Sequence, residues 1–189
     1  MDWLILLPVS VPGVKRMATE RLFLRVSSEP GPMRLSEIPE GGFCLSAFLV
    51  ISNSRNPKEV LLGHLNPDAP WDHIGALDPP RVEMHKNGWL LPSCHLIVGE
   101  SPQEASKRIL REQLGLSEQK LEGPVIFSEV YGKHSHWDLE FVFLGKRESV
   151  KKTPAWRELR FVDTSKLRKE DFARLHEDIL ANVGKWKPT

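Results

Sequence analysis

The chain has 189 residues, of which 27% are charged and 40% are hydrophobic, and its formal net charge is +1. This length and composition predict one globular domain with an appendage. The near-neutral charge excludes the strongly basic character of proteins that bind long nucleic acids, although it leaves room for a local basic patch. Two cysteines, Cys44 and Cys94, are too few for a disulfide framework, so we expect a reduced, cytoplasmic setting.

The first residues contain a short apolar run, Trp3 to Leu7, that ends at Pro8. The run is far shorter than the roughly 20 residues that span a bilayer. No basic residue precedes it, as one would in a signal peptide. We therefore expect no membrane partner. The run is either a peripheral strand or sequence upstream of a true start such as Met17, within an N-terminal extension of residues 1–41.

Alternating and continuous apolar segments predict a sheet in the rest of the chain. Residues 43–52 and 59–65 flank an Asn-Pro turn and are expected to form a hairpin with a buried first strand. The proline-containing segment 66–87 is predicted to be a long functional loop. Strands flanked by helices indicate an α/β/α sandwich over residues 42–183, with a tail at 184–189. Further strands are expected at 124–131, 136–144 and 156–162, and a helix at 169–183.

Residues 88–116 join a short strand, a Gly-Glu loop and a helix. Residues 89–91 are apolar and precede Pro92, so they are predicted to be a strand. Ser101 has the residue type of an N-cap, and Pro102 that of the first helical position. The helix is expected to run to about Leu114, before Gly115.

The helix should present two different faces. Ser106, Leu110 and Leu114 lie along one arc and are expected to pack on the sheet. Glu104 and Glu112 each lie four residues from Arg108, so Arg108 is predicted to pair with either carboxylate. Glu104 is interpreted as a first-turn residue that favours the helix dipole.

This segment resembles the Nudix box, G-x5-E-x7-R-E-U-x-E-E-x-G-U, the signature of hydrolases of nucleoside diphosphates linked to another moiety. The resemblance implies a Nudix-type α/β/α sandwich with a mixed sheet. Three positions depart from the motif: Cys94 replaces the opening glycine, Ile109 replaces the glutamate after the arginine, and Gln113 replaces the last glutamate. The matching residues are Glu100, Arg108, Leu110, Glu112, Gly115 and Leu116.

The resemblance implies hydrolysis assisted by Mg²⁺ or Mn²⁺, which neutralises phosphate oxygens and activates water. Positions 109, 112 and 113 fall within roughly one 100° sector of a helix, so three glutamates there would face one metal cluster. This chain keeps one of the three, Glu112. Glu100 and Glu112 are the predicted metal ligands; the alternatives are a solvated loop residue and a partner of Arg108. Glu112 and Arg108 are the predicted catalytic residues, with Arg108 orienting a carboxylate.

Other carboxylates could complete such a site, and Glu140 is the predicted catalytic one. His134, His136 and Asp138 could hold a metal such as Zn²⁺, although histidines beside a strand end are the alternative. The candidates for the additional carboxylate are Glu129, Asp138, Glu140 and Glu158.

Three aromatic side chains, Trp71, His73 and Trp137, are predicted to bind substrate by stacking on a nucleobase. The alternative is that the two tryptophans pack in the core. Cys94 is interpreted as a small buried residue rather than a nucleophile.

Two functions remain open from the sequence. The first is a divalent-metal-dependent hydrolase of a nucleoside diphosphate linked to another moiety, with an eroded metal site. The second is a catalytically inactive Nudix module that binds a nucleotide, RNA or a protein. The resemblance is compatible with a homodimer.

Overall fold

The computed structural model describes residues 4–5, 24–25, 42–97, 99–131 and 136–188. The chain divides into two compact units, one of Met1–Leu45 with Phe127–Glu140 and the other of Ser46–Ile126 with Phe141–Thr189. In the first unit, strands β1 (Leu4–Ile5) and β2 (Leu24–Arg25) pair antiparallel. The remainder of the predicted N-terminal extension, including Met17, lies outside the described residues.

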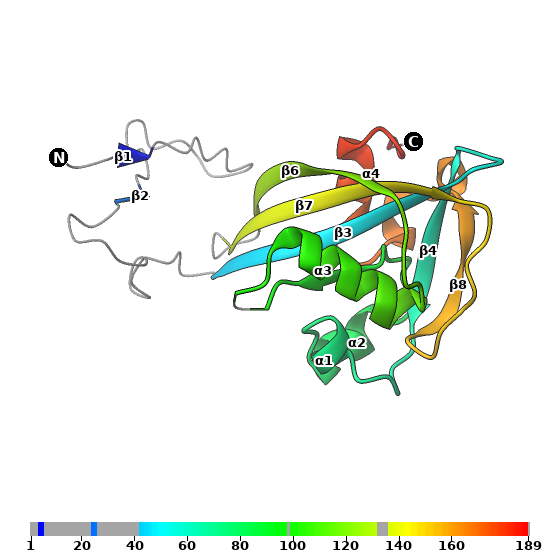
Figure 1. Ribbon diagram of the computed structural model, residues 1–189, viewed down its shortest axis with the longest axis horizontal. Coiled ribbons are helices and arrows are strands. Elements are labelled where there is room, and N and C mark those ends of the chain that lie inside the picture. The colour runs from blue at the N-terminus through cyan, green and yellow to red at the C-terminus, as the bar shows by residue number, and fades with distance from the viewer. Residues whose placement is uncertain (1–3, 6–23, 26–41, 98, 132–135, 189) are drawn as a thin grey trace. The chain divides into compact units, whose positions relative to one another are not determined.

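A six-stranded sheet has the order β6-β7-β3-β4-β8, with β5 paired to β3 (Figure 1). The predicted hairpin is confirmed, because β3 and β4 are antiparallel, with Ser52 opposite Val60. Strand β8 pairs along β4, with a register shift between His64 and Leu65. The strands are β3 (Phe43–Asn53), β4 (Glu59–Leu65), β5 (Ser93–His95), β6 (Leu121–Tyr131), β7 (His136–Arg147) and β8 (Trp156–Asp163).

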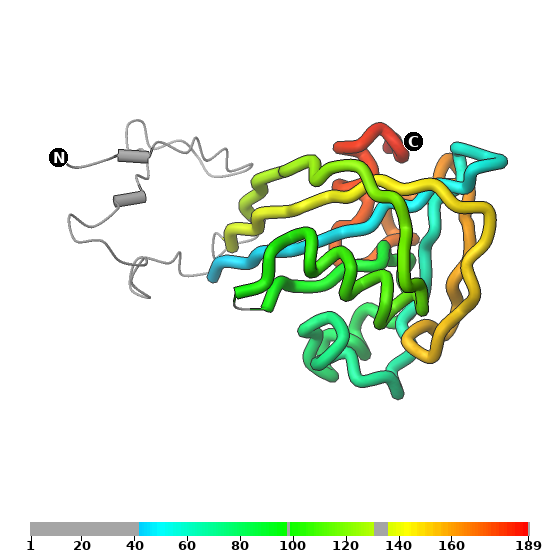
Figure 2. Tube along the Cα trace, viewed as in Figure 1, coloured from blue at the N-terminus to red at the C-terminus, as the bar shows by residue number. Residues whose placement is uncertain are grey.

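Helices flank this sheet, with α3 on one face and α4 on the other (Figure 1). The predicted α/β/α sandwich is therefore confirmed. Figure 2 traces the chain from α3 through a π-helical segment, η2, to β6. Among the described residues, no helix combines the length and the apolar character that crossing a membrane requires. The helical elements are α1 (Trp71–Ile74), α2 (Pro79–His85), α3 (Pro102–Arg108), η2 (Ile109–Gln113), the 3-10 turns η3 (Thr164–Lys166) and η4 (Lys169–Asp171), and α4 (His176–Asn182).

Strand alternation separates two buried faces in the second unit. Leu49 and Ile51 of β3 belong to the main apolar cluster, together with residues of α3 and η2. Phe48, on the opposite face of β3, meets the ring of His176 in α4 edge-on, with centroids 5.3 Å apart. The sheet therefore separates the helix that carries the box residues from the C-terminal helix.

The segment 66–87 was predicted to be a loop, and this is wrong, because it contains α1 and α2. Asp78 caps α2 by accepting a hydrogen bond from the backbone N–H of Arg81, and Pro79 occupies the first turn. Proline fits the first turn of a helix, where its missing N–H costs nothing. The prolines of this segment therefore begin a helix rather than exclude one.

Two other element boundaries also differ from the predictions. The C-terminal helix begins at His176, not Lys169, because Arg174 and Leu175 adopt left-handed φ values of 57° and 58° that interrupt a helix. In the predicted strand 89–91, Trp89 and Leu90 form only isolated bridges, and the strand of this segment is β5, after Pro92.

Candidate functional site

The helix α3 begins at the predicted N-cap, Ser101, with Pro102 in its first turn. The Ser101 hydroxyl accepts a hydrogen bond of 3.2 Å from the backbone N–H of Glu104, and the Glu104 carboxylate accepts one of 2.8 Å from the N–H of Ser101. This reciprocal capping box satisfies two of the free N–H groups at the helix start. The hydrogen bonds from Ser101 lower the pKa of Glu104. Glu104 therefore stabilises the helix start.

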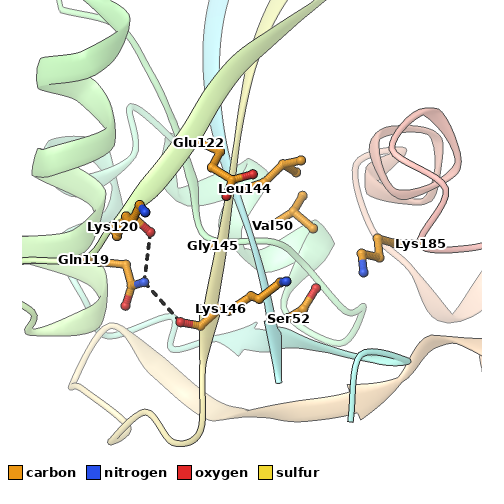
Figure 3. A pocket seen from close by; sticks show the side chains of 9 residues that line it. All are labelled: Val50, Ser52, Gln119, Lys120, Glu122, Leu144, Gly145, Lys146 and Lys185. Atoms are coloured by element: carbon orange, nitrogen blue, oxygen red, sulfur yellow. Dashed lines mark hydrogen bonds between the residues drawn. The ribbon is translucent and has the colours of Figure 1, made fainter. Parts of the chain in front are cut away.

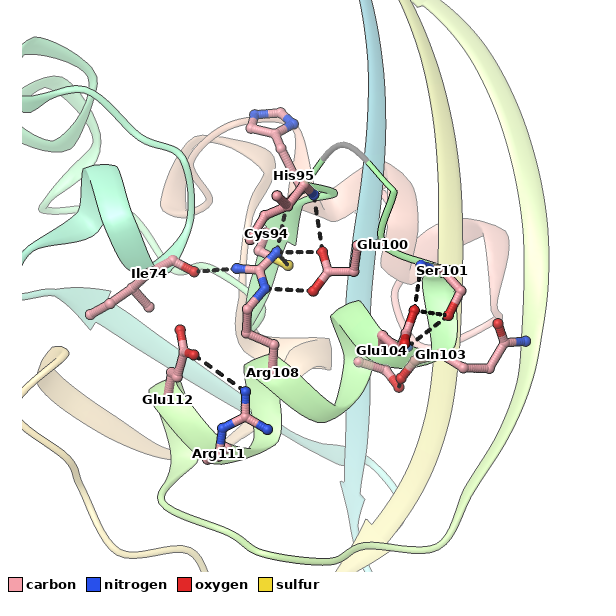
Figure 4. A network of polar contacts seen from close by, with 12 residues as sticks. Ile74, Cys94, His95, Glu100, Ser101, Gln103, Glu104, Arg108, Arg111 and Glu112 are labelled. Atoms are coloured by element: carbon pink, nitrogen blue, oxygen red, sulfur yellow. Dashed lines mark hydrogen bonds and ion pairs between the residues drawn. The ribbon is translucent and has the colours of Figure 1, made fainter.

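Arg108 pairs with Glu100, and the prediction that it pairs with Glu104 or Glu112 is wrong. Its Nε and Nη2 atoms lie 2.7 and 2.8 Å from the two Glu100 carboxylate oxygens (Figure 4). The backbone N–H of Ile97 donates a third hydrogen bond, of 3.0 Å, to Glu100 Oε2. The hydrogen bond from Arg108 lowers the pKa of Glu100. Arg108 therefore binds Glu100, which precedes the helix, instead of a carboxylate four residues away. Glu104 is already engaged in the helix cap.

The Arg108 guanidinium also joins elements distant in sequence. It donates hydrogen bonds to the carbonyl oxygens of Ile74 in α1, at 3.0 Å, and of His95 in β5, at 2.8 Å. It also lies 3.2 Å from the sulfur of Cys94. Arg108 is 7% exposed. A planar guanidinium has five N–H donors in a fixed arrangement, so it can satisfy several acceptors at once. Arg108 is therefore a positioning residue that holds the Glu100 loop, α1 and β5 together.

Cys94, at the position of the opening glycine of the box, is buried beside Arg108. Burial raises the pKa of its thiol to about 12, although the nearby guanidinium opposes this shift. The side chain is therefore a neutral thiol at neutral pH. This agrees with the prediction of a small buried residue rather than a nucleophile.

The segment Ile109–Gln113 widens into a π-helix, in which the N–H of Leu114 bonds to the carbonyl of Ile109. A π turn closes an i→i+5 hydrogen bond and so holds more residues than an α turn. Ile109 and Gln113 both face the interior, with exposures of 1% and 0%. The sequence had suggested an unbroken α-helix, and the π turn was not predicted.

Ile109 is part of the main apolar cluster, with Ala105, Leu110 and Leu114 of the same helix. Fully burying an aliphatic side chain of this size stabilises a fold by about 1.5–3 kcal/mol. The position that would carry a metal-binding glutamate in the motif is therefore a core position in this chain.

Gln113 binds the backbone of Ser93 through both ends of its side-chain amide. Its Oε1 accepts from the N–H of Ser93 at 3.2 Å, and its Nε2 donates to the carbonyl oxygen of Ser93 at 2.7 Å. A carboxylate has no N–H donor, so a glutamate here would leave the Ser93 carbonyl facing a negative charge. The Gln113 carbonyl also accepts from Trp156 Nε1 at 2.9 Å and from Thr153 Oγ1 at 2.7 Å. Sequence reasoning did not predict that Gln113 links η2 to β5. The only indication in the sequence was a neutral amide at a position where the motif has a glutamate.

Glu112 is the one motif glutamate left on this part of the helix. Its Oε1 lies 3.4 Å from an Arg111 guanidinium nitrogen (Figure 4). Its Oε2 is buried and has no hydrogen-bond partner among the described residues. Within the described part of the chain, no group of three or more His, Cys, Asp or Glu side chains could hold a metal ion. The residues of the box helix therefore do not fit the carboxylate cluster that the motif implies.

The aromatic residues predicted to bind substrate lie in different surroundings. Trp71 is 2% exposed, donates its ring N–H to the carbonyl of Asn66, and meets Trp156 edge-on. It is a core residue in this structure, which was the alternative considered. His73, two residues further on in α1, is exposed. Trp137 lies in the other compact unit, where its ring centroid is 4.8 Å from that of Phe43.

The candidate carboxylates outside the box belong to both compact units. Glu129, Asp138 and Glu140 lie in the first unit, and Glu140 is 3% exposed. Glu158, on β8, forms an ion pair with Arg160 and also lies near His64, so the Arg160 guanidinium already neutralises it. His134, the first member of the predicted His-His-Asp cluster, lies outside the described residues. The catalytic role of Glu140 stays a prediction.

The structure is similar to solved structures of Nudix-fold proteins. A MutT protein from Methanosarcina mazei Go1 is 17% identical, with a TM-score of 0.54, and the match covers 79% of this chain and 96% of that one. A MutT protein from Bacillus halodurans is 18% identical, with a TM-score of 0.51, and the match covers 74% and 81%. No protein-family model and no curated protein matches the sequence. These likenesses establish the Nudix fold.

A third similar structure is a bifunctional NMN adenylyltransferase/ADP ribose pyrophosphatase from Francisella tularensis. It is 12% identical, with a TM-score of 0.50, and the match covers 79% of this chain and 43% of that one. At this level of identity the likeness again concerns the fold.

Proposed function

We propose that the chain is a Nudix-fold binding module that does not hydrolyse diphosphates and that takes a nucleotide-derived small molecule as its ligand. The observation that carries the proposal is that two motif positions expected to bind a metal are buried in the protein interior. Ile109 packs in the core, and Gln113 is fully buried against the backbone of Ser93. Both positions serve the architecture of the fold.

The remaining oxygen atoms of the box support the same proposal. Mg²⁺ requires several hard oxygen ligands. The Gln113 side-chain oxygen accepts a hydrogen bond from Ser93, and both Glu100 oxygens accept from Arg108. Among the described residues of the box, only Glu112 has a buried carboxylate oxygen without a hydrogen-bond partner. One carboxylate oxygen does not make the multi-ligand cluster that would neutralise a diphosphate and activate water.

The fold and the exposed side chains beside η2 support a nucleotide-derived ligand. Helix α1 contacts η2, and His73 of α1 and Arg111 of η2 are both exposed. An imidazole can stack on a base, and a guanidinium can pair with a phosphate in a bidentate manner. One structure of this fold carries the name of an ADP ribose pyrophosphatase. We therefore choose ADP-ribose as the first probe.

A second candidate function is the metal-dependent hydrolase, and one observation favours it. The buried Oε2 of Glu112 lacks a hydrogen-bond partner among the described residues, and a divalent cation would satisfy it. In this case Glu112 would be a metal ligand.

Calorimetric titration with ADP-ribose separates the two functions. The metal-stripped protein is titrated with and without Mg²⁺, and chromatography of the same samples detects AMP and ribose 5-phosphate. We expect equal binding under both conditions and no products. Products that require the metal, disappear in Glu112→Gln and persist in Glu118→Gln would establish the hydrolase instead. Glu118 is an exposed carboxylate beyond the helix and provides the matched control. A lack of binding under both conditions would contradict the nucleotide ligand and favour RNA or a protein partner.

A further inference from the structure

The second compact unit contains a pocket of about 360 Å³ that none of the box residues lines (Figure 3). Its walls come from β3, β6 and the two residues before it, β7, and the segment that follows α4. Small-molecule sites in proteins have volumes of roughly 300–1,000 Å³. The pocket is thus large enough for a small metabolite, and it is independent of the site discussed above.

Strand alternation places this pocket on the sheet face away from the box helix. Leu49 and Ile51 belong to the apolar cluster that includes α3 and η2 residues, whereas Val50 and Ser52 line the pocket. Consecutive residues of a strand point to opposite faces of its sheet. Lys185, which follows α4, lines the other side. The pocket therefore lies on the face of the sheet that α4 covers.

The pocket has an excess of positive charge. Three lysines, Lys120, Lys146 and Lys185, line it together with a single carboxylate, Glu122. Elsewhere lysines do pair with carboxylates, but none of these three does so among the described residues. The pairs that lysines form are Lys86–Glu83, Lys166–Asp163 and Lys169–Glu177. A protein of net charge +1 thus gathers uncompensated ammonium groups around one small cavity.

Two of the lysines are directed at the hydroxyl of Ser52. The Ser52 side chain lines the pocket, and no side-chain hydrogen bond joins its hydroxyl to another described residue. In Figure 3 the side chains of Lys146 and Lys185 point toward Ser52 from opposite sides. Lys185 is also anchored, because its ammonium donates a hydrogen bond of 3.3 Å to the carbonyl of Pro57. A hydroxyl and an ammonium group both donate hydrogen bonds, so an acceptor placed between these side chains could bind to all three.

Gln119 orders the chain segments that carry two of the lysines. Its side-chain nitrogen donates to the backbone carbonyls of Lys120, at 3.0 Å, and of Lys146, at 3.2 Å (Figure 3). Its side-chain oxygen accepts from Arg147 at 3.1 Å. A backbone that is already ordered loses less entropy when a ligand binds. The two lysine-bearing segments are thus held in place before an anion arrives.

We propose that this pocket binds a small organic phosphate. The phosphate would accept hydrogen bonds from Lys146, Lys185 and Ser52, and the organic part would lie against the apolar side chains of Val50 and Leu144. A phosphate has several acceptor oxygens and up to two negative charges, which matches several ammonium donors and one hydroxyl. The limited volume favours a small metabolite over a polymer. This proposal does not depend on the function of the box.

The test is an NMR titration of the full chain at low salt with ribose 5-phosphate, with inorganic phosphate and free ribose as comparison ligands. We expect saturable amide shifts at Ser52, Lys146 and Lys185 with ribose 5-phosphate. Inorganic phosphate should bind more weakly, and ribose should not bind. The double variant Lys146→Gln/Lys185→Gln should weaken binding roughly tenfold or more, since it removes two charge-assisted hydrogen bonds.

The matched control is Lys151→Gln/Lys166→Gln, which removes the same charge from exposed positions outside the pocket. It should keep the affinity of the unaltered protein. If the pocket double variant does not fold, Ser52→Ala provides a smaller change and should still lower the affinity severalfold. Equal affinities in both double variants, or no saturable binding of ribose 5-phosphate, would overturn the proposal. If inorganic phosphate bound as tightly as ribose 5-phosphate, the proposed contacts of the organic group with Val50 and Leu144 would be refuted.

Discussion

The two halves of the box helix differ in what their charged motif positions do. Around α3, Glu100 and Arg108 form a bidentate ion pair that is buried and linked to α1 and β5. In η2, which follows directly, two motif positions carry Ile109 and Gln113, which are uncharged and fully buried. The motif therefore combines two separable tasks. This chain retains the residues that shape the loop and replaces most of those that would bind a metal.

The largest effect is expected from restoring the missing charge at position 109. Ile109→Glu would bury a carboxylate in the apolar cluster, so we expect a loss of more than about 4 kcal/mol in the free energy of unfolding. Urea denaturation measures this loss. Arg111→Glu, at an exposed position in the same π turn, should change stability by less than about 1 kcal/mol. A stable Ile109→Glu variant that binds Mn²⁺ would mean that this position still belongs to a metal site.

The next largest effect should come from removing the ion pair. Arg108→Ala leaves the Glu100 carboxylate without its partner and frees two backbone carbonyls, so we expect a loss of about 3–5 kcal/mol. Arg108→Lys should recover only part of it, because an ammonium cannot reproduce the bidentate geometry. Full recovery by lysine in a urea titration would show that charge alone, and not the hydrogen-bond network, holds the loop.

The same variant should change the response to acid. The pKa of Glu100 is lowered in the folded protein, so its contribution to stability is present above its unfolded pKa and is lost as the pH falls through the folded pKa. In Arg108→Ala this acid-dependent loss should be smaller. Denaturation curves between about pH 6 and pH 3 test this, and an unchanged acid slope would contradict the assignment.

A smaller effect is expected for Gln113→Glu, which restores the last motif glutamate. The new side chain cannot donate to the Ser93 carbonyl while ionised, so we expect a loss of about 1–3 kcal/mol at neutral pH. At low pH the carboxyl group is protonated and can donate, so the loss should shrink. Gln103→Glu, in the exposed first turn of α3, is the control and should not lose stability. A loss that grows on acidification would contradict the hydrogen-bond account.

The smallest effect concerns His176, which lies on the sheet face away from the box helix. Its burial should make the free energy of unfolding depend on pH independently of the box. His176 is 2% exposed, its Nδ1 accepts from the N–H of Leu91, and burial holds its pKa well below the usual value. The unfolded chain binds a proton below about pH 6.5 and the folded chain does not, so stability falls as the pH drops below that value. His176→Gln should remove this slope, amounting to about 1 kcal/mol between pH 6.5 and pH 5.5. A slope that persists in the variant would place the sensitivity elsewhere.

The features that sequence reasoning predicted correctly are governed by neighbouring residues. Ser101 and Pro102 define the start of α3 through local hydrogen bonding and fixed backbone geometry. The β3–β4 hairpin follows from apolar patterning around a turn, and β4 has the predicted bounds, Glu59–Leu65. The alternation of β3 similarly determines which residues can reach each face.

The features that it missed depend on tertiary contacts. The π turn places Ile109 in the core and Gln113 against Ser93, twenty residues earlier in the chain. The choice of Glu100 as the partner of Arg108 depends on how the loop folds back, and regular helical spacing does not describe it. Likewise, Lys120, Lys146 and Lys185 are widely spaced in sequence, and only the sheet and the segment after α4 bring them to one pocket.

The most direct test of the central claim is a Mn²⁺ titration followed by electron paramagnetic resonance, which measures the free ion. The claim is that the box of this chain organises the fold and does not form a divalent-metal site. We predict that the unaltered protein and Glu112→Gln leave the same amount of Mn²⁺ free at every concentration. A stoichiometric site in the unaltered protein that disappears in Glu112→Gln and persists in Glu118→Gln would contradict the claim and restore the hydrolase as the better account.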